Sequence, residues 1–276
     1  MTFLTRFAPS PTGYLHVGNI RTALFNFLLS KKNKGKFLLR IDDTDLERSK
    51  QVYEDEIKRD LEWLGIEWDF CEKQSTRFDR YYEVLENLKS KNKIYPCYET
   101  KSELDLKRKK QLNMGKPPIY DRVALKLSLE DHKKFEEEGK KAHWRFLLDK
   151  KKICWNDEII GTVSIDLESL SDPVFVKEDG QFLYTLASVC DDIDFCITHV
   201  VRGSDHLTNT ATQIQLIQDL GFDVPIYGHH SLLIDSSGDN LSKRLGSLSI
   251  REIRNSGIEP MALINLMSAL GSSKSP

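Results

Sequence analysis

The first fifty residues carry the hydrophobic pattern of a strand, a helix and a second strand. Residues 3–8 form a short apolar stretch that Pro9 ends, and residues 36–41 form another. Between them, residues 19–30 repeat apolar side chains at the three- and four-residue spacing of a helix. The pattern predicts a βαβ unit with a right-handed crossover, in which a turn-rich loop leads from the first strand into the helix.

Two further helices are predicted before the pattern changes. Residues 49–64 form the first, with Ser49 as its N-cap and Gly65 directly after its end. Residues 78–91 form the second, whose apolar face contains Tyr82, Leu85 and Leu88.

The middle of the chain has a different composition and hydrophobic pattern. Residues 101–152 are highly charged, and short apolar segments and turns follow them. Strand–helix alternation then returns, with a strand predicted over 193–201 and a helix over 208–220. The expected fold is therefore α/β: a Rossmann-like doubly wound parallel sheet, interrupted by an α+β insertion at 97–180 and followed by the start of a helical region at 250–270.

Composition narrows the class of protein. The chain has 276 residues, of which 39% are hydrophobic and 30% charged, so it can bury a core and is not disordered. It has no apolar run near the ~20 residues of a membrane span and no signal-peptide layout. Five scattered cysteines without a Cys-x-x-Cys pair argue against a disulfide scaffold and a four-cysteine zinc site. We expect a soluble cytoplasmic protein.

Charge is distributed unevenly, although the formal net charge is only -2. Residues 101–152 contain 16 Lys and Arg against 9 Asp and Glu, including the basic run Lys107, Arg108, Lys109 and Lys110. Such a run is either a solvated helical face or a phosphate-binding surface, and charge alone favours the solvated face.

Two short motifs carry candidate chemistry, and neither is a P-loop or a Gly-x-Gly-x-x-Gly loop. His16, Gly18 and Asn19 stand where a loop opens a helix, and free N–H groups at a helix N-terminus bind anions. The second motif, Leu241-Ser242-Lys243-Arg244, follows a turn-forming stretch that could deliver cations to a triphosphate. Taken singly, a polar loop and a charged surface loop are the better explanations of these motifs.

Together the motifs resemble a known family. Residues 8–18 are similar to the "HIGH" signature of class I aminoacyl-tRNA synthetases in its bacterial glutamyl form, and residues 241–244 are similar to the "KMSKS" signature. Three more segments match the glutamyl-tRNA synthetases in the same order, at 41–49, 116–121 and 201–210.

The resemblance implies a domain organisation. A discontinuous Rossmann-like catalytic domain would comprise 1–96 and 181–249, and the insertion at 97–180 would bind the tRNA acceptor end. Residues 250–276 would begin the helical stem-contact region. The anticodon-binding domain of the family is absent from this chain, so we expect a fragment of a longer, monomeric enzyme.

The resemblance also implies an activity: ATP-dependent attachment of L-glutamate to tRNA(Glu) through a glutamyl-adenylate, with tRNA(Gln) left open as a second acceptor. Magnesium would accompany ATP. His16 and Lys243 would be the catalytic residues. The residues that match the family's ATP contacts are Ser10, His16, Gly18, Asn19, Leu241, Ser242, Lys243 and Arg244.

The charges of glutamate match the implied pocket, whose residues are Arg6, Ala8, Ser10, Asp42, Tyr184, Ser188 and Arg202. Arg6 and Arg202 would bind the two carboxylates, since a guanidinium suits bidentate carboxylate binding. Asp42 would face the ammonium group, where the family usually has Glu. Structural salt bridges and a core tyrosine are the competing explanations.

Several positions depart from the family pattern. Asn240 replaces the first lysine of the second signature, and Ser204 replaces an acidic residue. Cys97 is retained, but no Cys or His follows Tyr120 as in relatives that bind zinc, so no metal site is expected. Asp191 and Asp192 are expected to be structural or to face a ribose, and Lys107, Arg108, Lys109 and Lys110 to bind tRNA phosphates.

Three alternatives remain open. A glutamyl-queuosine tRNA(Asp) synthetase is a shorter relative without an anticodon domain. A catalytically silent paralogue that binds tRNA or nucleotide would tolerate the departures at Asp42, Ser204 and Asn240. A small-molecule nucleotidyltransferase of the same superfamily would share a similar helix-start motif, but it would not need an acceptor-binding insertion.

Overall fold

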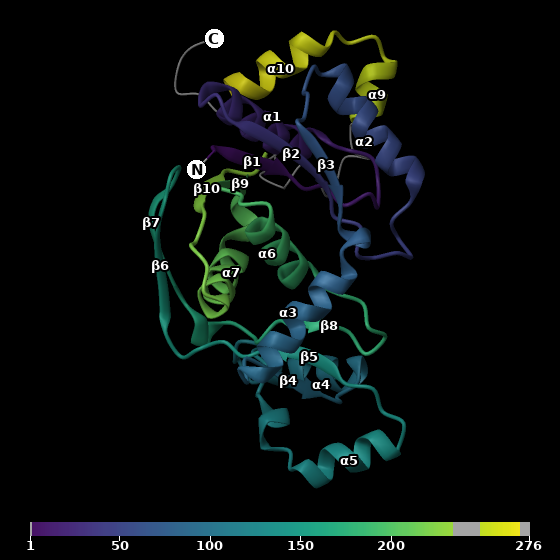
Figure 1. The fold of residues 1–276 in the computed structure, drawn as a ribbon, viewed down its shortest axis with the longest axis vertical. Helices are drawn as coiled ribbons and strands as arrows, with labels where there is room; N and C mark the ends of the chain where they lie inside the picture. Colours follow the sequence, from purple (N-terminus) through teal and green to yellow (C-terminus); the bar gives the residue numbers. More distant parts are fainter. Residues whose placement is uncertain (1, 234–248, 271–276) are drawn as a thin grey trace.

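The structure, a computed structural model, describes residues 2–233 and 249–270. Its first half contains the predicted βαβ unit (Figure 1). Strand β1 (Leu4–Phe7) pairs in parallel with β2 (Lys36–Ile41), and β2 pairs in parallel with β3 (Phe70–Lys73). Helix α1 (Val17–Lys32) crosses from β1 to β2, and α2 (Gln51–Trp63) from β2 to β3.

A second parallel pair completes the sheet. Strand β9 (His199–Gly203) pairs with β10 (Ile226–His230), and the two are connected by α7 (Leu207–Leu220). Thr198, directly before β9, donates its backbone N–H to the Leu4 carbonyl at 3.0 Å, so the second pair adjoins β1. The strand order is β3-β2-β1-β9-β10, which confirms the Rossmann-like doubly wound sheet.

Apolar side chains fill both faces of this sheet. Leu39 and Ile41 of β2 pack with Ile20 and Leu24 of α1 and with Ile57 of α2, and all five are fully buried or nearly so. On the other face, a larger cluster packs around α6 (Tyr184–Asp194), α7 and α3 (Phe78–Ser90). Helices on both faces explain why β2 is a nearly continuous apolar run.

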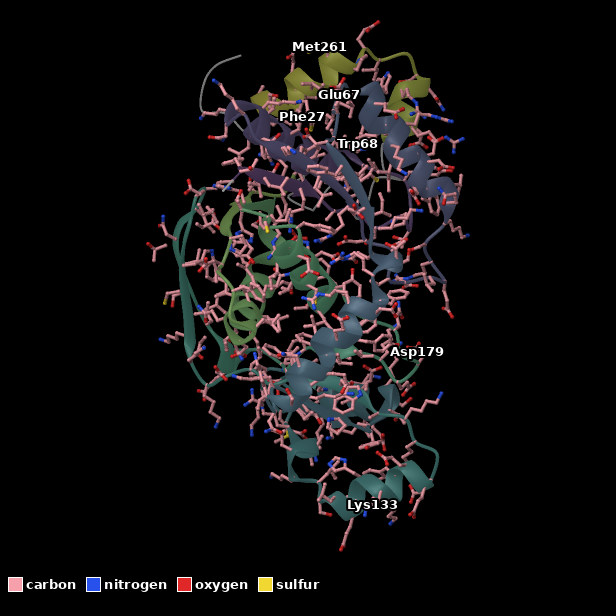
Figure 2. All side chains as sticks on the ribbon, in the orientation of Figure 1. Phe27, Glu67, Trp68, Lys133, Asp179 and Met261 are labelled. Atoms are coloured by element: carbon pink, nitrogen blue, oxygen red, sulfur yellow. The ribbon has the colours of Figure 1, made fainter. Side chains whose placement is uncertain are left out.

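The segment after α3 forms a separate antiparallel layer at the lower end of Figure 1. Its strands are β4 (Ile94–Cys97), β5 (His143–Phe146) and β8 (Val174–Val176), in the order β4-β5-β8. Two helices, α4 (Lys101–Asn113) and α5 (Leu129–Glu137), have no buried residue. In Figure 2, Lys133 on α5 lies at the opposite end of the molecule from Met261.

A long hairpin runs along the side of the molecule between these two parts (Figure 1). Its strands, β6 (Lys152–Asp157) and β7 (Gly161–Asp166), pair with each other, and its tip reaches β10. Short 3-10 helices lie at Gln74–Thr76, Val123–Lys126, Leu167–Ser169 and Ser204–His206.

Two local predictions near the first helices were wrong. Helix α2 begins after Lys50, and Ser49 is not its N-cap, because Ser49 belongs to a turn in which its N–H donates to the Asp45 carbonyl. On α3, Tyr82 is 47% exposed, and Tyr81 occupies the buried face instead. Gly65 follows the end of α2 with a φ of 68°, as predicted.

The predicted strand over 193–201 was also wrong in its first half. Helix α6 continues to Asp194, and only His199–Gly203 is a strand. The alternation of apolar and polar residues after Ile193 resembles a strand, but Asp191, Asp192 and Asp194 all contact arginines from other elements, and these contacts accompany the helix.

The last predicted helix is two helices. Helix α9 (Ile250–Asn255) and α10 (Pro260–Ala269) are separated by Gly257, which has a φ of 79°, and Pro260 opens the second helix. Among the described residues, none of the helices has the length and apolar character needed to cross a membrane.

Candidate active site

A cavity of about 640 Å³ lies at the carboxyl ends of β1, β2 and β9, beside the start of α1. This edge is where parallel α/β sheets bind ligands. The cavity brings together nine of the residues proposed from the sequence, which are Arg6, Ala8, Ser10, His16, Gly18, Asn19, Asp42, Tyr184 and Arg202.

The start of α1 is held by its own side chains. His16 is the N-cap residue, and its Nδ1 accepts the N–H of Gly18 at 3.2 Å. Asn19 completes a capping box, since its Oδ1 accepts the N–H of His16 at 3.1 Å. No acidic residue stands in the first turn, so the positive end of the helix is not neutralised there.

Gly18 is favoured by the limited space beside the His16 ring rather than by its backbone angles. A Cβ at this position would lie 3.0 Å from Cε1 of His16. Burial lowers the pKa of His16, so the imidazole is neutral at pH 7. Because Nδ1 accepts a hydrogen bond, the proton of the neutral ring is on Nε2.

The second signature, with Leu241, Ser242, Lys243 and Arg244, lies outside the described residues, as does Asn240. The described residues on both sides of it lie at the cavity. Leu232 and Leu233 line it, and Ser249 forms a β-bridge with His16. Ile250 also donates its N–H to the Leu15 carbonyl at 2.8 Å.

Arg202 is buried and surrounded by neutral acceptors. It donates from Nη1 to the Tyr184 hydroxyl at 2.8 Å, and from Nη2 to Thr210 Oγ1 and Gln213 Oε1, both at 2.6 Å. Its Nε lies 3.5 Å from Nε2 of His229. No carboxylate among the described residues forms an ion pair with Arg202, and one N–H of Nη1 has no partner there.

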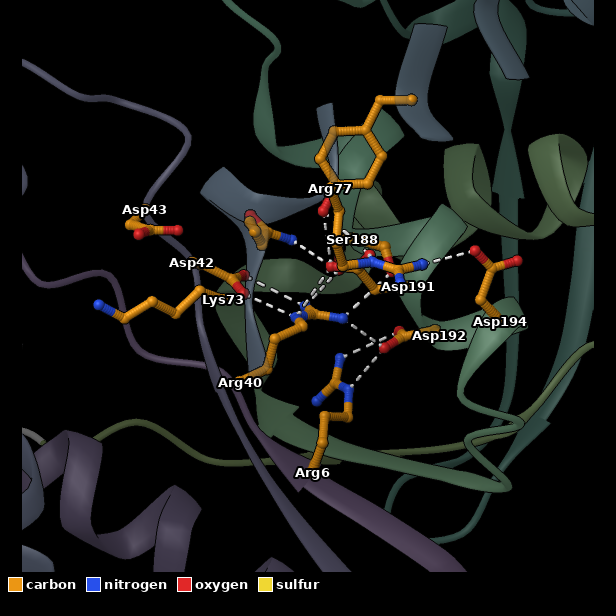
Figure 3. Close-up of polar contacts among 12 residues, drawn as sticks. Arg6, Arg40, Asp42, Asp43, Lys73, Arg77, Ser188, Asp191, Asp192 and Asp194 are labelled. Carbon is orange, nitrogen blue, oxygen red and sulfur yellow. Dashed lines mark hydrogen bonds and ion pairs between the residues drawn. The ribbon is translucent and has the colours of Figure 1, made fainter. Parts of the chain in front are cut away.

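Arg40 contrasts with Arg202, because carboxylates surround it (Figure 3). This fully buried side chain forms ion pairs with Asp42, Asp191 and Asp192, at 2.6, 3.7 and 2.8 Å. Arg6 shares Asp192, with 3.2 Å between Nε and Oδ1. The sequence analysis did not identify Arg40, although a lone arginine in the apolar run of β2 was the available signal.

Asp42 lies in the cavity but is not a free carboxylate. Arg40 donates to both of its oxygens, at 2.6 and 3.1 Å. Burial raises the pKa of Asp42 to about 6, and the ion pair with Arg40 offsets only part of that effect. Each oxygen retains a lone pair, so Asp42 can accept one more hydrogen bond from the cavity side.

Ser188 is outside the cavity lining and fully buried. Its Oγ accepts from Nη2 of Arg40 at 3.0 Å, so it supports Arg40 rather than contacting the cavity directly. Asp191 accepts hydrogen bonds from Gln74, Arg77 and Tyr81, which indicates the structural role preferred for it.

The basic run lies on α4, far from the cavity in the lower layer (Figure 1). Lys107 is partly neutralised within the chain, since its Nζ lies 2.5 Å from Glu99 and 3.1 Å from Asp121. Arg108, Lys109 and Lys110 are exposed, and no ion pair to them occurs among the described residues.

Cys97 is buried beneath Tyr120, whose hydroxyl donates to Glu99 at 2.6 Å and lies 3.6 Å from the thiol. Burial raises the pKa of Cys97 to about 11, which disfavours the thiolate that zinc requires. In the part of the chain that the structure describes, no group of three or more His, Cys, Asp or Glu side chains could hold a metal ion.

Comparison with known sequences gives a consistent result. The family described as "tRNA synthetases class I (E and Q), catalytic domain" matches residues 2–275. The chain is 60% identical over 270 residues to glutamate--tRNA ligase 1 of Paracoccus denitrificans, and 59% identical over 274 residues to glutamate--tRNA ligase 2 of Cereibacter sphaeroides. These matches cover 98% and 99% of this chain but 61% and 62% of the relatives.

Solved structures agree with the sequences. A glutamate tRNA ligase from Elizabethkingia meningosepticum, in complex with its amino acid, matches with a TM-score of 0.89 and 33% identity. The match covers 99% of this chain and 61% of that one. The glutamate-tRNA synthetase of Elizabethkingia anophelis matches with a TM-score of 0.91 and 33% identity. That match covers 100% of this chain and 63% of the other. The chain belongs to the class I tRNA synthetases (E and Q), and it corresponds to their catalytic domain.

Proposed function

We propose that this chain carries the catalytic site for ATP-dependent attachment of L-glutamate to tRNA(Glu), through a glutamyl-adenylate. The observation that carries the proposal is the Arg202 guanidinium, a buried cation without a carboxylate partner among the described residues. An unpaired buried charge is costly unless a ligand of opposite charge completes it.

The pocket supplies groups for each charge of glutamate. Arg202 has one N–H free on Nη1, and Arg6 uses Nε and Nη2 for Asp192 while its Nη1 has no partner within the described ranges. These free donors would bind the two carboxylates. Asp42 would accept from the ammonium, and the Tyr184 hydroxyl, which accepts from Arg202, would donate its proton to a substrate oxygen.

ATP would lie against the start of α1. In the first step, a carboxylate oxygen of glutamate attacks the α-phosphorus, and the bond to the pyrophosphate leaving group breaks. The Nε2–H of His16 and the free N–H groups of the first turn would stabilise the phosphate charge. Lys243, together with Leu241, Ser242 and Arg244, is assigned to the phosphates from the family signature alone.

In the second step, a hydroxyl of the terminal tRNA ribose attacks the glutamyl carbonyl, and AMP leaves. The insertion at 97–180 would hold the acceptor end, with the exposed cations of α4 contacting phosphates. Magnesium would enter with ATP, since it is normally held by phosphate oxygens and water more than by a protein cage. We expect a monomer acting in the cytoplasm, with residues 1–96 and 181–249 as the catalytic domain.

The test is pyrophosphate–ATP exchange with glutamate, with and without tRNA, and with glutamine as the control amino acid. Exchange that requires both glutamate and tRNA is the expected result. Exchange without tRNA would favour the glutamyl-queuosine type instead. If neither this chain nor a chain extended beyond Pro276 exchanges, the silent paralogue is the correct alternative.

A further inference from the structure

A second histidine–carboxylate pair lies behind the cavity. Asp157, the last residue of β6, and His229 of β10 both have fully buried side chains. Oδ2 of Asp157 and Nδ1 of His229 are 2.5 Å apart. Neither residue lines the cavity, and neither belongs to the family motifs identified in the sequence.

The contacts of Asp157 fix its state. Its Oδ1 accepts backbone N–H groups from His229, Ile159 and Ile160, at 3.0, 3.1 and 3.2 Å. Burial alone would raise the pKa of Asp157, but the hydrogen bonds from the His229 ring and these N–H groups outweigh it and lower the pKa. A carboxylate with this environment only accepts hydrogen bonds, so Nδ1 of His229 carries a proton.

The other nitrogen of His229 must then be an acceptor. Burial lowers the pKa of His229, so the ring is neutral and Nε2 has a free lone pair. Two donors meet that lone pair, since Thr210 Oγ1 lies 2.8 Å away and Nε of Arg202 lies 3.5 Å away. The single hydroxyl proton of Thr210 has a second acceptor in the His206 carbonyl at 3.2 Å, and the shorter distance favours His229. Thr210 in turn accepts from Nη2 of Arg202 at 2.6 Å.

These bonds form one directional chain from Arg202 through Thr210 and His229 to Asp157. We propose that Asp157 and His229 are positioning residues for Arg202: Asp157 selects the Nδ1–H tautomer of His229, and that tautomer holds the guanidinium aimed into the cavity. The inference rests on the proposed function, in which Arg202 binds a carboxylate of glutamate.

This chain of hydrogen bonds connects two parts of the molecule. Asp157 belongs to the β6–β7 hairpin, within the segment expected to contact tRNA, whereas Arg202 belongs to the parallel sheet. The hairpin therefore acts on the amino-acid pocket through one side chain, although it contributes no residue to the lining of that cavity.

The competing explanation is that the pair only attaches the hairpin to the sheet. The variant Asp157→Asn distinguishes this explanation from the positioning role. Asparagine can keep its oxygen toward the three backbone N–H groups, and its amide then faces Nδ1 of His229. The amide also replaces the acceptor of the Trp155 indole N–H, a long contact of 3.4 Å. The ring must accept at Nδ1 and carry its proton on Nε2, which opposes the donors of Thr210 and Arg202.

For Asp157→Asn we expect the KM for glutamate in the exchange assay to rise roughly 10- to 100-fold, while the KM for ATP stays within about twofold. Asp172→Asn is the matched control, because Asp172 is a buried carboxylate that accepts from Tyr95 and Arg122, remote from Arg202. The control should leave the KM for glutamate within about twofold.

A spectroscopic readout makes the test independent of activity. In ¹⁵N spectra of histidine-labelled protein, the wild-type His229 ring should be the Nδ1–H tautomer, and Asp157→Asn should convert it to Nε2–H. The signal is assigned by its loss in His229→Gln. A wild-type Nε2–H ring overturns the inference, whether or not the protein activates glutamate.

A second pair of variants covers the case in which Asp157→Asn does not fold. Thr210→Val removes the hydroxyl and should raise the KM for glutamate, whereas Thr210→Ser keeps it and should restore the wild-type value. Unchanged KM values in Thr210→Val and Asp157→Asn contradict the positioning role. Loss of exchange in the wild-type chain contradicts the proposed function instead.

Discussion

Two buried arginines lie near the same cavity, and their surroundings differ in one respect. Arg40 is enclosed by Asp42, Asp191 and Asp192, whereas Arg202 is surrounded by hydroxyl, amide and imidazole groups without charge. Both are hydrogen-bonded and at most 5% exposed, so burial does not distinguish them. The difference is contact with carboxylates: Arg40 forms ion pairs with three of them, whereas Arg202 forms none among the described residues, although its charge helps to lower the pKa of Asp192. Under the proposed function, a carboxylate of glutamate completes Arg202.

The comparison predicts that Arg40→Met damages folding. The substitution leaves three carboxylates without their shared cation, and breaking a buried ion pair from one side costs about 3–5 kcal/mol. Urea unfolding should show a loss of that size. The control is Arg202→Met, which leaves neutral acceptors but no carboxylate without a partner, and should cost less, about 1–3 kcal/mol. Equal losses of unfolding free energy in the two variants would show that the two arginines do not differ in how the protein compensates their charge.

Arg202→Met should instead damage activity. Without the guanidinium, a substrate carboxylate enters the cavity unpaired, which lowers glutamate-dependent exchange by roughly 100-fold or more. Arg202→Lys keeps the charge but cannot reproduce the fork of donors to Tyr184, Thr210 and Gln213, so it should rescue only partly. Full activity in Arg202→Met would show that the cavity binds no carboxylate there.

The amino end of α1 is a second uncompensated positive feature, and Gly18→Ala tests it. The added Cβ would meet the His16 ring at 3.0 Å and displace the N-cap side chain. We expect exchange to fall by roughly tenfold, because a small displacement of a positioning group affects the reacting geometry. The unfolding free energy should change little, and exchange at the wild-type rate would show that the His16 ring accommodates the methyl group.

These contrasts show what the sequence could and could not predict. The strands and the helix of the βαβ unit follow from short-range hydrophobic periodicity, so local pattern was sufficient for them, whereas the N-cap role of His16 was not predicted. Arg202 was found only through the resemblance to a family. Arg40 was missed because its partners other than Asp42 lie about 150 residues away on α6, and no local pattern connects them to β2.

The two errors in the predicted elements have different origins. The segment after Ile193 alternates like a strand, yet long-range contacts of Asp191 and Asp194 with Arg77 accompany a helix. Ser49 has the composition of an N-cap, but a turn beginning at Asp45 already uses its backbone. In the first case tertiary contacts outweighed a local preference, and in the second one local structure outweighed another.

Titration of Asp42 predicts two pH dependences of opposite sign. As the pH rises, the stability of the fold should fall and the binding of glutamate should improve. Its pKa is about 6 in the folded protein against an ordinary value of 3.8, so the folded state holds a proton that the unfolded state has lost. The wild type therefore loses stability, by up to about 3 kcal/mol, as the pH rises from about 4 to about 6. Asp42→Asn should lack this loss when unfolding is measured across the same range.

Substrate binding should respond in the other direction. The ammonium group of glutamate requires ionised Asp42, so the KM for glutamate should rise about tenfold between pH 7 and pH 5. Asp42→Asn should have a high KM at every pH, without this dependence. A wild-type KM that does not vary over this range would place the ammonium group away from Asp42.

The smallest expected effect comes from comparing paired and unpaired cations on the surface of α4. Lys107 is already paired with Glu99 and Asp121, whereas Arg108 and its two basic successors have no ion pair among the described residues. Arg108→Ala should raise the KM for tRNA a few-fold and reduce its salt dependence by the equivalent of about one phosphate contact. Lys107→Ala should change both quantities less, because the lysine must first leave two carboxylates to reach a phosphate. Equal effects of the two variants at several salt concentrations would show that tRNA displaces those carboxylates from Lys107. Ion pairing within the protein would then not distinguish which cations of this exposed helix bind phosphate.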